Sequence, residues 1–187
     1  MHINKRMSPL ELLLNASEEQ LEQYCKDPLN RNICNSEEFY EQKSYLQIPL
    51  ELLYFKSNTL EGKDMTWKEF YQRVIVLVNN PNVSDLRMFL IRAGRLLELK
   101  IVNVLYPNQQ FTQKHADAAA YFGRLNVIIW LASKNIYPSE HGIEQARKNK
   151  HYAIVEWLAL KGRLISRRHP RSGIKEYDPV YILTVKK

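Results

Sequence analysis

Few side chains in this sequence have the type and spacing that chemistry requires. Cys25 and Cys34 stand nine residues apart with no histidine near them, so they could form at most a disulfide or part of a metal site. Two cysteines do not make the disulfide framework of a small secreted protein, and buried free thiols are the preferred interpretation. His115 and Asp117 would point from different faces of a helix, which argues against a base with its orienting carboxylate.

Motifs for catalysis and cofactor binding are missing from the chain. The six glycines are scattered, so no phosphate-binding loop is formed, and no serine stands in a Gly-x-Ser-x-Gly turn. Neither His-Glu-x-x-His nor paired Cys-x-x-Cys spacing occurs. We therefore expect a protein that is not an enzyme, with no catalytic, cofactor-binding or metal-binding residues. His141 and His151 are expected to have structural or surface roles.

The last part of the chain, "KGRLISRRHPRSGIKEYDPVYILTVKK", carries the strongest chemical signal. Arginine suits bidentate contact with phosphate or carboxylate groups, while Pro170, Gly173 and Pro179 prevent a continuous helix. The segment is either a polar cap on the molecule or a contact for nucleic acid or an acidic partner, and "VYILTV" at 180–185 could form a strand. The candidate phosphate-contacting residues are Arg163, Arg167, Arg168, Arg171 and Lys175.

Charge divides the chain into two halves. Residues 1–85 carry 9 Lys and Arg against 13 Asp and Glu, a net charge of −4, and residues 86–187 carry 18 against 7, a net charge of +11. The second half has either a solvated basic surface or an acidic or phosphate-bearing partner.

No apolar run approaches the roughly 18 residues that span a membrane, and the start lacks a small-residue cleavage site. We expect no membrane association and an intracellular, reducing location.

Signals for helix starts recur along the first half. Ser8 and Thr66 are each followed three residues later by glutamate, the pattern of a capping box, and Ser17 opens a further amphipathic segment. "PLELL" occurs at 9–13 and again at 49–53, but the apolar spacing after the two copies differs. The two copies therefore reflect a common way to begin a helix, and they do not indicate a forty-residue repeat.

A better repeat lies further along the chain. The segments "AAYFGRLNVIIWL" (119–131) and "ARKNKHYAIVEWL" (146–158) agree at five positions, each pair 27 residues apart, and a weaker copy, "AGRLLELKIVNVL" (93–105), precedes them. Self-similarity at this period indicates stacked pairs of helices, whereas chance agreement within a plain helical bundle is the less favoured alternative. We expect Trp130 and Trp157 to be core residues in equivalent surroundings.

The stretch "AAYFGRLNVIIWLASKN" resembles the ankyrin repeat, in which small residues, a helix-breaking glycine and an apolar second helix follow in order. The resemblance covers about residues 84–165. "KHADA" and "HGIEQ" replace the usual Thr-Pro-Leu-His start, and the short period implies trimmed β-hairpin fingers. The resemblance implies protein binding through a concave face of first helices and turns. The exposed candidates there are Lys114, Asp117, Tyr121, Glu144, Arg147 and Lys148.

The first 47 residues resemble a short F-box-like segment, with "PLELL", a polar-capped helix and a final aromatic pair. This order of segments is similar to proteins that giant DNA viruses encode in large families. In that family an F-box engages the adaptor subunit of a cullin ubiquitin ligase. The resemblance implies contacts by Pro9, Leu10, Leu13 and Leu14. The alternative, that these leucines form the core of a three-helix cap, is equally open.

The expected fold is all-α, with a helical N-terminal segment at 1–47, a connector at 48–83, ankyrin-like repeats at 84–165 and a basic segment at 166–187. The expected function is non-enzymatic binding of a partner protein through the helical stack, with an added role as adaptor to ubiquitin-ligase machinery. The rival hypothesis is a virion structural or nucleic-acid-associated protein that uses the basic half. A viral protein would act in the host cytoplasm or in the virion.

Overall fold

A computed structural model of the chain describes residues 8–80, 82–168 and 175–179, without the side chains of Pro9, 164–168 and 175–179. Helices make up nearly all of this part, which confirms the prediction of a helical protein, and one two-stranded antiparallel sheet adds to it. Within the described ranges, no helix has both the length and the apolar character needed to cross a membrane.

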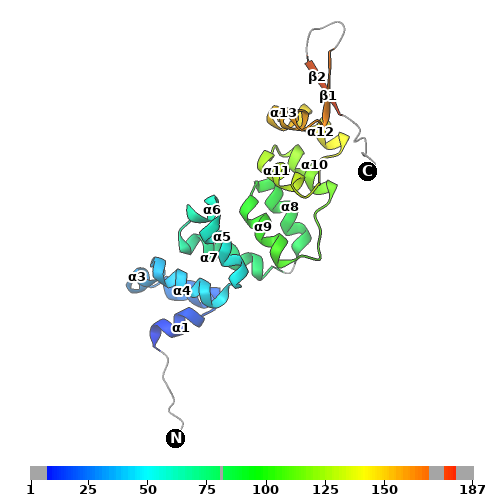
Figure 1. The fold of residues 1–187 in the computed structure, drawn as a ribbon. Coiled ribbons are helices and arrows are strands. Elements are labelled where there is room, and N and C mark those ends of the chain that lie inside the picture. The colour runs from blue at the N-terminus through cyan, green and yellow to red at the C-terminus, as the bar shows by residue number, and fades with distance from the viewer. Residues whose placement is uncertain (1–7, 81, 169–174, 180–187) are drawn as a thin grey trace. The chain divides into compact units, whose positions relative to one another are not determined.

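The described chain forms two compact units (Figure 1). Unit 1 contains the described residues up to 80 together with 100–106, and unit 2 contains 82–99 and the described residues from 107 onward. Helix α9 (Leu96–Leu105) begins in unit 2 and ends in unit 1. The predicted segments 1–47 and 48–83 thus contribute most of unit 1.

Unit 1 is built from short helices that begin at strong capping signals. Ser8 Oγ accepts a hydrogen bond from the Glu11 N–H at 3.2 Å, and the Glu11 carboxylate accepts one from the Ser8 N–H at 2.7 Å. The same reciprocal pattern begins the helices that follow Ser17 and Thr66, as predicted. The helices are α1 (Pro9–Asn15), α2 (Glu18–Cys25), η1 (Pro28–Asn30), α3 (Arg31–Cys34), α4 (Glu37–Gln47), α5 (Leu50–Asn58), α6 (Leu60–Lys63) and α7 (Trp67–Val78).

The core of unit 1 lies where α4 packs against α7. Phe39 and Tyr40 from α4 and Phe70 and Tyr71 from α7 are all buried, and the rings of Tyr40 and Tyr71 lie 5.7 Å apart. Helices α1 and α5 also contact α4. Burial of these large apolar rings stabilises the unit and holds α4 and α7 together.

Unit 2 is a series of helix–turn–helix pairs followed by a β-hairpin. Helix α10 contacts both α8 and α12, so the first helices of the pairs form one layer, and the second helices α11 and α13 also contact each other (Figure 1). Besides the start of α9, its elements are α8 (Val83–Ala93), α10 (Gln113–Tyr121), α11 (Leu125–Ala132), α12 (Glu140–Lys148), α13 (Tyr152–Leu160), β1 (Leu164–Arg168) and β2 (Lys175–Pro179).

The same tight turn ends the first helix of each pair. Gly94, Gly123 and Lys150 have φ values of 73°, 71° and 62°, in the left-handed region. In each turn the N–H of the next residue donates to the carbonyl five residues earlier, at 2.8–3.0 Å, which is the Schellman arrangement. Because all three turns share this geometry, they define equivalent positions in the three pairs.

These turns correct the register of the weaker repeat. The second and third turns are 27 residues apart, as predicted, but the first and second are 29 apart. Leu90 therefore takes the place of Ala119, where the sequence comparison had put Ala93. The pairs Ala119–Ala146, Val127–Ile154, Ile128–Val155 and Leu131–Leu158 are buried at both members.

The two strands pair in antiparallel fashion, with Leu164 opposite Pro179 and Arg168 opposite Lys175. Strand β1 contacts α13, so the hairpin follows directly on the last helical pair. The strand predicted at 180–185 lies outside the described residues.

Candidate functional site

Helix α1 separates the four residues that were assigned to partner binding. Leu13 and Leu14 are only 6% and 8% exposed, so they belong to the core of unit 1, and their assignment as contacts is corrected. Leu10 is 42% exposed and remains available, and Leu12, which the sequence interpretation had left out, is 52% exposed. The side chain of Pro9 lies outside the described part of the structure.

A buried lysine binds the C-terminal end of α1. Lys43 is fully buried, and its Nζ donates to the carbonyl oxygens of Leu13, Leu14 and Ala16 at 3.1, 3.1 and 2.8 Å. An ammonium group has three donors and no acceptor, so its hydrogen-bonding capacity is fully used. A cation also suits the carbonyl end of a helix, where the macrodipole is negative. Burial lowers the pKa of Lys43.

Two more polar groups extend this contact into the core. Gln47 donates to the Leu14 carbonyl at 2.9 Å, and its own Oε1 accepts from the Tyr71 hydroxyl at 2.6 Å. Burial, together with the negative charge of Glu18 nearby, raises the pKa of Tyr71. Sequence reasoning did not find Lys43. Its only signal is that it follows Phe39 and Tyr40 at helical spacing, on the apolar face of α4.

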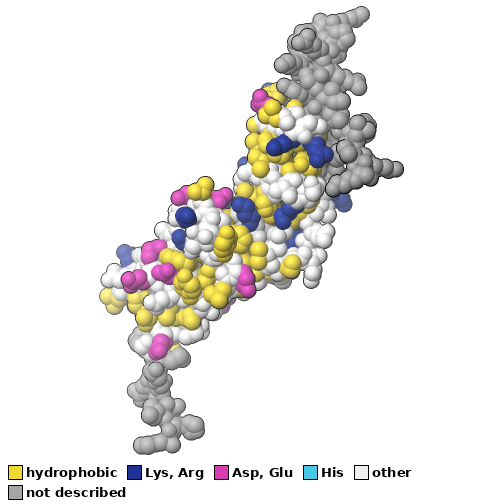
Figure 2. All heavy atoms as spheres, viewed as in Figure 1, with side chains coloured by type: hydrophobic (Ala, Val, Ile, Leu, Met, Phe, Trp, Pro, Cys, Tyr) yellow, Lys and Arg dark blue, Asp and Glu magenta, His cyan; other side chains and the backbone are white. Residues whose placement is uncertain are grey.

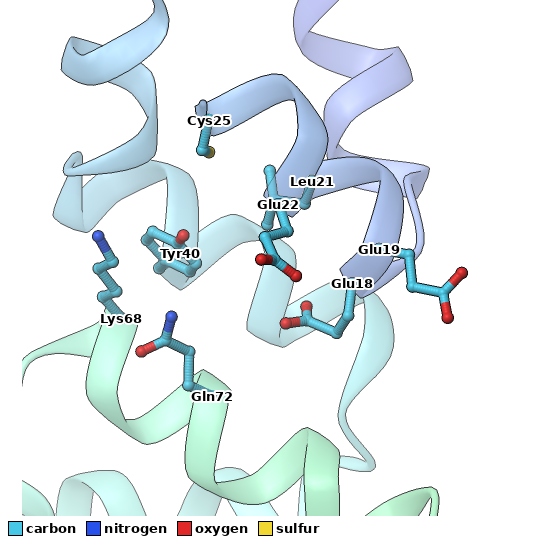
Figure 3. A pocket seen from close by; sticks show the side chains of 8 residues that line it. All are labelled: Glu18, Glu19, Leu21, Glu22, Cys25, Tyr40, Lys68 and Gln72. Atoms are coloured by element: carbon cyan, nitrogen blue, oxygen red, sulfur yellow. The ribbon is translucent and has the colours of Figure 1, made fainter. Parts of the chain in front are cut away.

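A cavity of about 320 Å³ opens between α2 and α7 in unit 1 (Figure 3). The carboxylates of Glu18 and Glu22 face it from α2, and Gln72 reaches into it from α7. The full lining is Glu18, Glu19, Leu21, Glu22, Cys25, Tyr40, Lys68 and Gln72. The position of Glu18 and Glu19 in the first turn of α2 also complements the positive end of that helix, but Glu22 lies one turn later and has no such role.

Tyr40 forms a buried part of this lining. The residue is 3% exposed, yet within the described ranges its hydroxyl makes no hydrogen bond. Burial, and secondarily the charge of Glu18, raises the pKa of this phenol. The Lys68 Nζ lies 5.6 Å from the centre of the Tyr40 ring and donates to Asn35 Oδ1 at 2.8 Å. The cation beside the cavity therefore already has an acceptor of its own.

The two cysteines are joined, which corrects the preference for free thiols. Cys25 at the end of α2 and Cys34 at the end of α3 form a disulfide with a Cα–Cα distance of 5.8 Å. The bond ties the helix that carries Glu18 and Glu22 to the end of α3. Spacing alone left this pairing open, because a separation of nine residues does not specify which way two thiols point.

In unit 2 the first helices expose equivalent positions on one face, which we call the first-helix face. Asp85, Phe89 and Arg92 on α8 match Lys114, Ala118 and Tyr121 on α10 and His141, Gln145 and Lys148 on α12, by the register of the three turns. Spacings of four and three residues place each trio on one side of its helix. Phe89 and Tyr121 are 57% and 48% exposed, unusually high for aromatic rings.

The six residues predicted to bind a partner on this surface differ in their exposure and in their contacts. Lys114, Tyr121 and Lys148 are exposed. Glu144 forms ion pairs on its own helix with Arg147 and Lys148, at 3.6 and 3.7 Å. Arg147 is half-buried, whereas Lys148 is exposed, and the exposed pair of Lys148 with Glu144 contributes little to stability and can rearrange for a partner.

Asp117 is a structural residue, which corrects its assignment to partner binding. Its Oδ1 accepts from the Ser139 N–H at 2.6 Å, and its Oδ2 accepts from the Ser139 hydroxyl at 2.9 Å. Ser139 in turn caps α12. A carboxylate of one helical pair thus fixes the start of the next, and both of its oxygens are occupied.

A second contact recurs between successive pairs. Arg124 Nε donates to the Arg92 carbonyl at 2.8 Å, and His151 Nε2, 27 residues later, lies 2.9 Å from the Tyr121 carbonyl. Both side chains lie against the left-handed glycine of the preceding turn, Gly94 or Gly123. Sequence reasoning assigned His151 only a general structural or surface role. The signal for the contact is the position of both residues directly after the helix break.

The two tryptophans share one contact at the same spacing, and both are half-buried and not part of the closed core. Lys134 Nζ lies 5.3 Å from the Trp130 ring, and Lys161 Nζ lies 5.8 Å from the Trp157 ring, each lysine four residues after its tryptophan. Phe111 packs edge-on against Trp130 at 5.0 Å. The expectation of full burial is corrected. The lysine contact is common to both tryptophans, whereas among the described residues an aromatic contact is found at Trp130 and not at Trp157.

The basic residues near the C-terminal end are only partly described. The guanidinium of Arg163 stacks on the Tyr137 ring at 3.9 Å, a contact that holds it against unit 2. Arg167, Arg168 and Lys175 occupy positions in β1 and β2, while Arg171 lies outside the described residues.

Charge is distributed unevenly over the described surface. On the face shown in Figure 2, Asp and Glu side chains gather mostly over unit 1, and Lys and Arg side chains recur over unit 2. Among the described residues, no three His, Cys, Asp or Glu side chains are placed to hold a metal ion together. What these surfaces can do chemically is therefore recognition: an acidic cavity in unit 1 and an aromatic, basic face in unit 2.

Comparison of the chain with known proteins found no matching family model, no matching curated protein and no matching solved structure.

Proposed function

We propose that this protein is a non-enzymatic interaction module that binds a partner protein through the first-helix face of an ankyrin-like stack in unit 2. The observation that carries the proposal is that one position of the register is exposed on all three first helices and holds a large aromatic or cationic side chain each time: Arg92, Tyr121 and Lys148. Phe89 and Tyr121 supply large rigid rings, and Arg92, Lys114 and Lys148 supply positive charge. Aromatic residues and arginine are the side chains most enriched in protein interfaces.

The first-helix face also has the rigidity that recognition requires. Asp117 and His151 each bridge two successive helical pairs, so the spacing of the exposed side chains is held by contacts below them. A preformed surface loses less conformational entropy when a partner binds. The face carries more basic than acidic side chains, so a partner with an acidic patch would complement it.

Differential co-purification tests this proposal. We expect the double variant Phe89→Ser/Tyr121→Ser to lose a protein that the wild-type chain captures from its native source, as identified by mass spectrometry. Tyr152→Ser is the matched control, since Tyr152 is 61% exposed in unit 2 but lies on a second helix, away from this face. If the control also loses this protein, or if the double variant retains it, the first-helix face is not the binding surface.

We further propose that α1 docks onto the adaptor subunit of a ubiquitin ligase through Leu10 and Leu12. Both side chains are largely exposed on a short helix, an arrangement that otherwise leaves apolar surface in water. Deleting the first 47 residues would not test this, because Phe39, Tyr40 and Lys43 belong to the core. Leu10→Ser/Leu12→Ser should abolish binding of purified adaptor, and Leu29→Ser, at an 88% exposed leucine, should not.

Nucleic acid is the second candidate partner, favoured by the net charge of +11 over residues 86–187. Binding to phosphates releases counterions, so retention on heparin or DNA should fall steeply with salt. Retention that vanishes at moderate salt, together with wild-type behaviour of Phe89→Ser/Tyr121→Ser, would favour this second function over protein binding.

A further inference from the structure

We propose that the cavity between α2 and α7 of unit 1 binds the arginine side chain of a basic peptide segment from a partner protein. This site lies in a different unit from the first-helix face and does not depend on the function proposed for it. The polar groups assigned to the ligand are the carboxylates of Glu18 and Glu22, the Tyr40 hydroxyl and the Gln72 amide; Glu19 and Lys68 also line the cavity.

The carboxylates provide the charge for such a ligand. Glu18 and Glu22 are separated by one helical turn, so their side chains leave the same face of α2, and both face the cavity in Figure 3. A guanidinium is a planar fork of five N–H donors without an acceptor, and it can bridge two carboxylates. A compact metal ion would require convergent ligands, and the described side chains offer no such group.

Tyr40 is the observation that points from an acidic surface to a ligand. A side chain that is 97% buried normally has its polar atom paired, yet the hydroxyl makes no hydrogen bond to any residue of the described part. The hydroxyl oxygen can accept one N–H of a guanidinium that lies between the two carboxylates. The oxygen is not among the buried unpaired atoms of the described residues, so it is accessible from the cavity, and the guanidinium would replace water there.

Size and hydration favour arginine over other cations. A cavity of about 320 Å³ lies at the lower end of the range for small-ligand sites, so it suits one side chain and not a folded surface. A guanidinium is more weakly hydrated than an ammonium group and loses less on entering a partly closed site. Lys68 also lines the cavity, but its Nζ donates to Asn35 Oδ1, and no ion pair joins it to Glu18 or Glu22 among the described residues.

Fluorescence anisotropy with the full-length protein tests this proposal. The probe is a short labelled peptide with one arginine among glycines, compared with the same peptide containing lysine or citrulline. We expect the arginine peptide to bind at least about tenfold more tightly than either, since charge-assisted bidentate hydrogen bonds are the strong ones. If the citrulline peptide binds as tightly as the arginine peptide, the site does not recognise positive charge. If the lysine peptide binds as tightly, the site does not recognise the guanidinium group. Either result overturns the proposal.

Three variants locate the binding on the protein. Glu18→Gln/Glu22→Gln should weaken the arginine peptide about tenfold or more, while Glu51→Gln, which removes an exposed charge from α5, should not. Tyr40→Phe should leave the thermal unfolding temperature unchanged, because the hydroxyl has no partner among the described residues, yet weaken the peptide about two- to tenfold. Wild-type affinity in the double variant or in Tyr40→Phe would rule out this cavity as the site.

Discussion

At the scale of single residues, unit 1 depends on a buried cation whose hydrogen bonds go to backbone carbonyls. Lys43 is fully buried and its three donors go to three backbone carbonyls at the end of α1. Burying a charge is unfavourable unless hydrogen bonds compensate, and here every donor has an acceptor. The four last carbonyls of a helix lack partners within it. The Lys43 side chain therefore supplies donors for carbonyls at the end of α1, and these carbonyls supply acceptors for its buried ammonium group.

We expect Lys43→Met to destabilise unit 1 by roughly 2 kcal/mol, as measured by chemical denaturation. Methionine fills most of the volume of the lysine stem but removes three hydrogen bonds from a charged donor. The Ala16 N–H still donates to the Leu13 carbonyl, and Gln47 still donates to the Leu14 carbonyl. Lys63→Met, at an exposed lysine of α6, is the control and should change stability by less than about 0.5 kcal/mol. Equal effects of the two substitutions would mean that the buried hydrogen bonds contribute nothing.

His115 makes the start of α10 sensitive to acid. Its Nδ1 accepts from the Thr112 N–H at 3.0 Å, which requires that nitrogen to be unprotonated. Burial, and secondarily the charge of Arg87, lowers the pKa of His115 below its ordinary value of 6.5. The unfolded chain then binds the proton more readily, so stability should fall as the pH drops from 6.5 through the lower folded-state pKa.

The matched variant for this prediction is His115→Gln. Glutamine at this position can make the same reciprocal cap but does not titrate. Thermal unfolding across the acid range should therefore show a smaller loss of stability in the variant than in the wild-type protein. Parallel pH profiles for the two proteins would contradict the assignment to His115.

At the scale of elements, local signals were predictable and long-range ones were not. Ser8 and Thr66 begin helices because a cap involves only residues three positions apart. The contacts of Lys43 with the α1 carbonyls join residues 27 to 30 positions apart, and that of Asp117 with Ser139 joins residues 22 apart. No spacing rule reports such pairs, because they depend on how helices pack after they form.

The repeat shows the same limit. The 27-residue period was readable because small and apolar residues occupy the same buried positions in both copies. The copy at Ala93 was misplaced because Leu90 fills the position that alanine holds in the other two pairs, and because the first spacing is 29. The left-handed turn is the feature common to all three pairs. In the last pair it is not recognisable from the sequence, because the left-handed residue there is Lys150 and not glycine.

We expect the turn at Gly123 to be more sensitive to substitution than the one at Gly162. Both glycines are left-handed, with φ of 71° and 65°, so alanine costs about 1 kcal/mol in strain at either site. A Cβ at Gly123 would also meet the His151 ring at 2.7 Å, whereas none of the described atoms lies within 4 Å of one at Gly162.

Denaturation of Gly123→Ala and Gly162→Ala measures this difference. The first should be less stable by about a further 1–2 kcal/mol, the usual range for a crowded site. His151→Ala in the Gly123→Ala background should recover part of the excess, because it removes the ring that the new methyl group meets. If the two glycine variants are equally stable, the contact between successive helical pairs is not a source of stability.

At the scale of the whole molecule, the two units differ in charge and in how they are held together. Unit 1 carries an acidic cavity, a buried lysine and a disulfide, whereas unit 2 is held by the same turn and the same inter-pair contacts repeated along the chain. Repeated units that contact only their neighbours can gain or lose stability locally. A change confined to unit 1 should therefore be visible there first.

The Cys25–Cys34 disulfide provides that change. Closing a loop of about ten residues restricts the unfolded chain and is worth roughly 2–3 kcal/mol, so reduction should destabilise unit 1 by about this amount. Amide hydrogen exchange on the oxidised and reduced protein should show faster exchange in α2, α3 and α4 and unchanged exchange in α10 to α13. Equal acceleration in both sets of helices would mean that the chain unfolds as one cooperative body. Thiol alkylation of protein taken from its native source without reduction tests whether the disulfide forms in the cell. A disulfide persists only in an oxidising environment. Labelling of both cysteines would therefore place the protein in a reducing compartment.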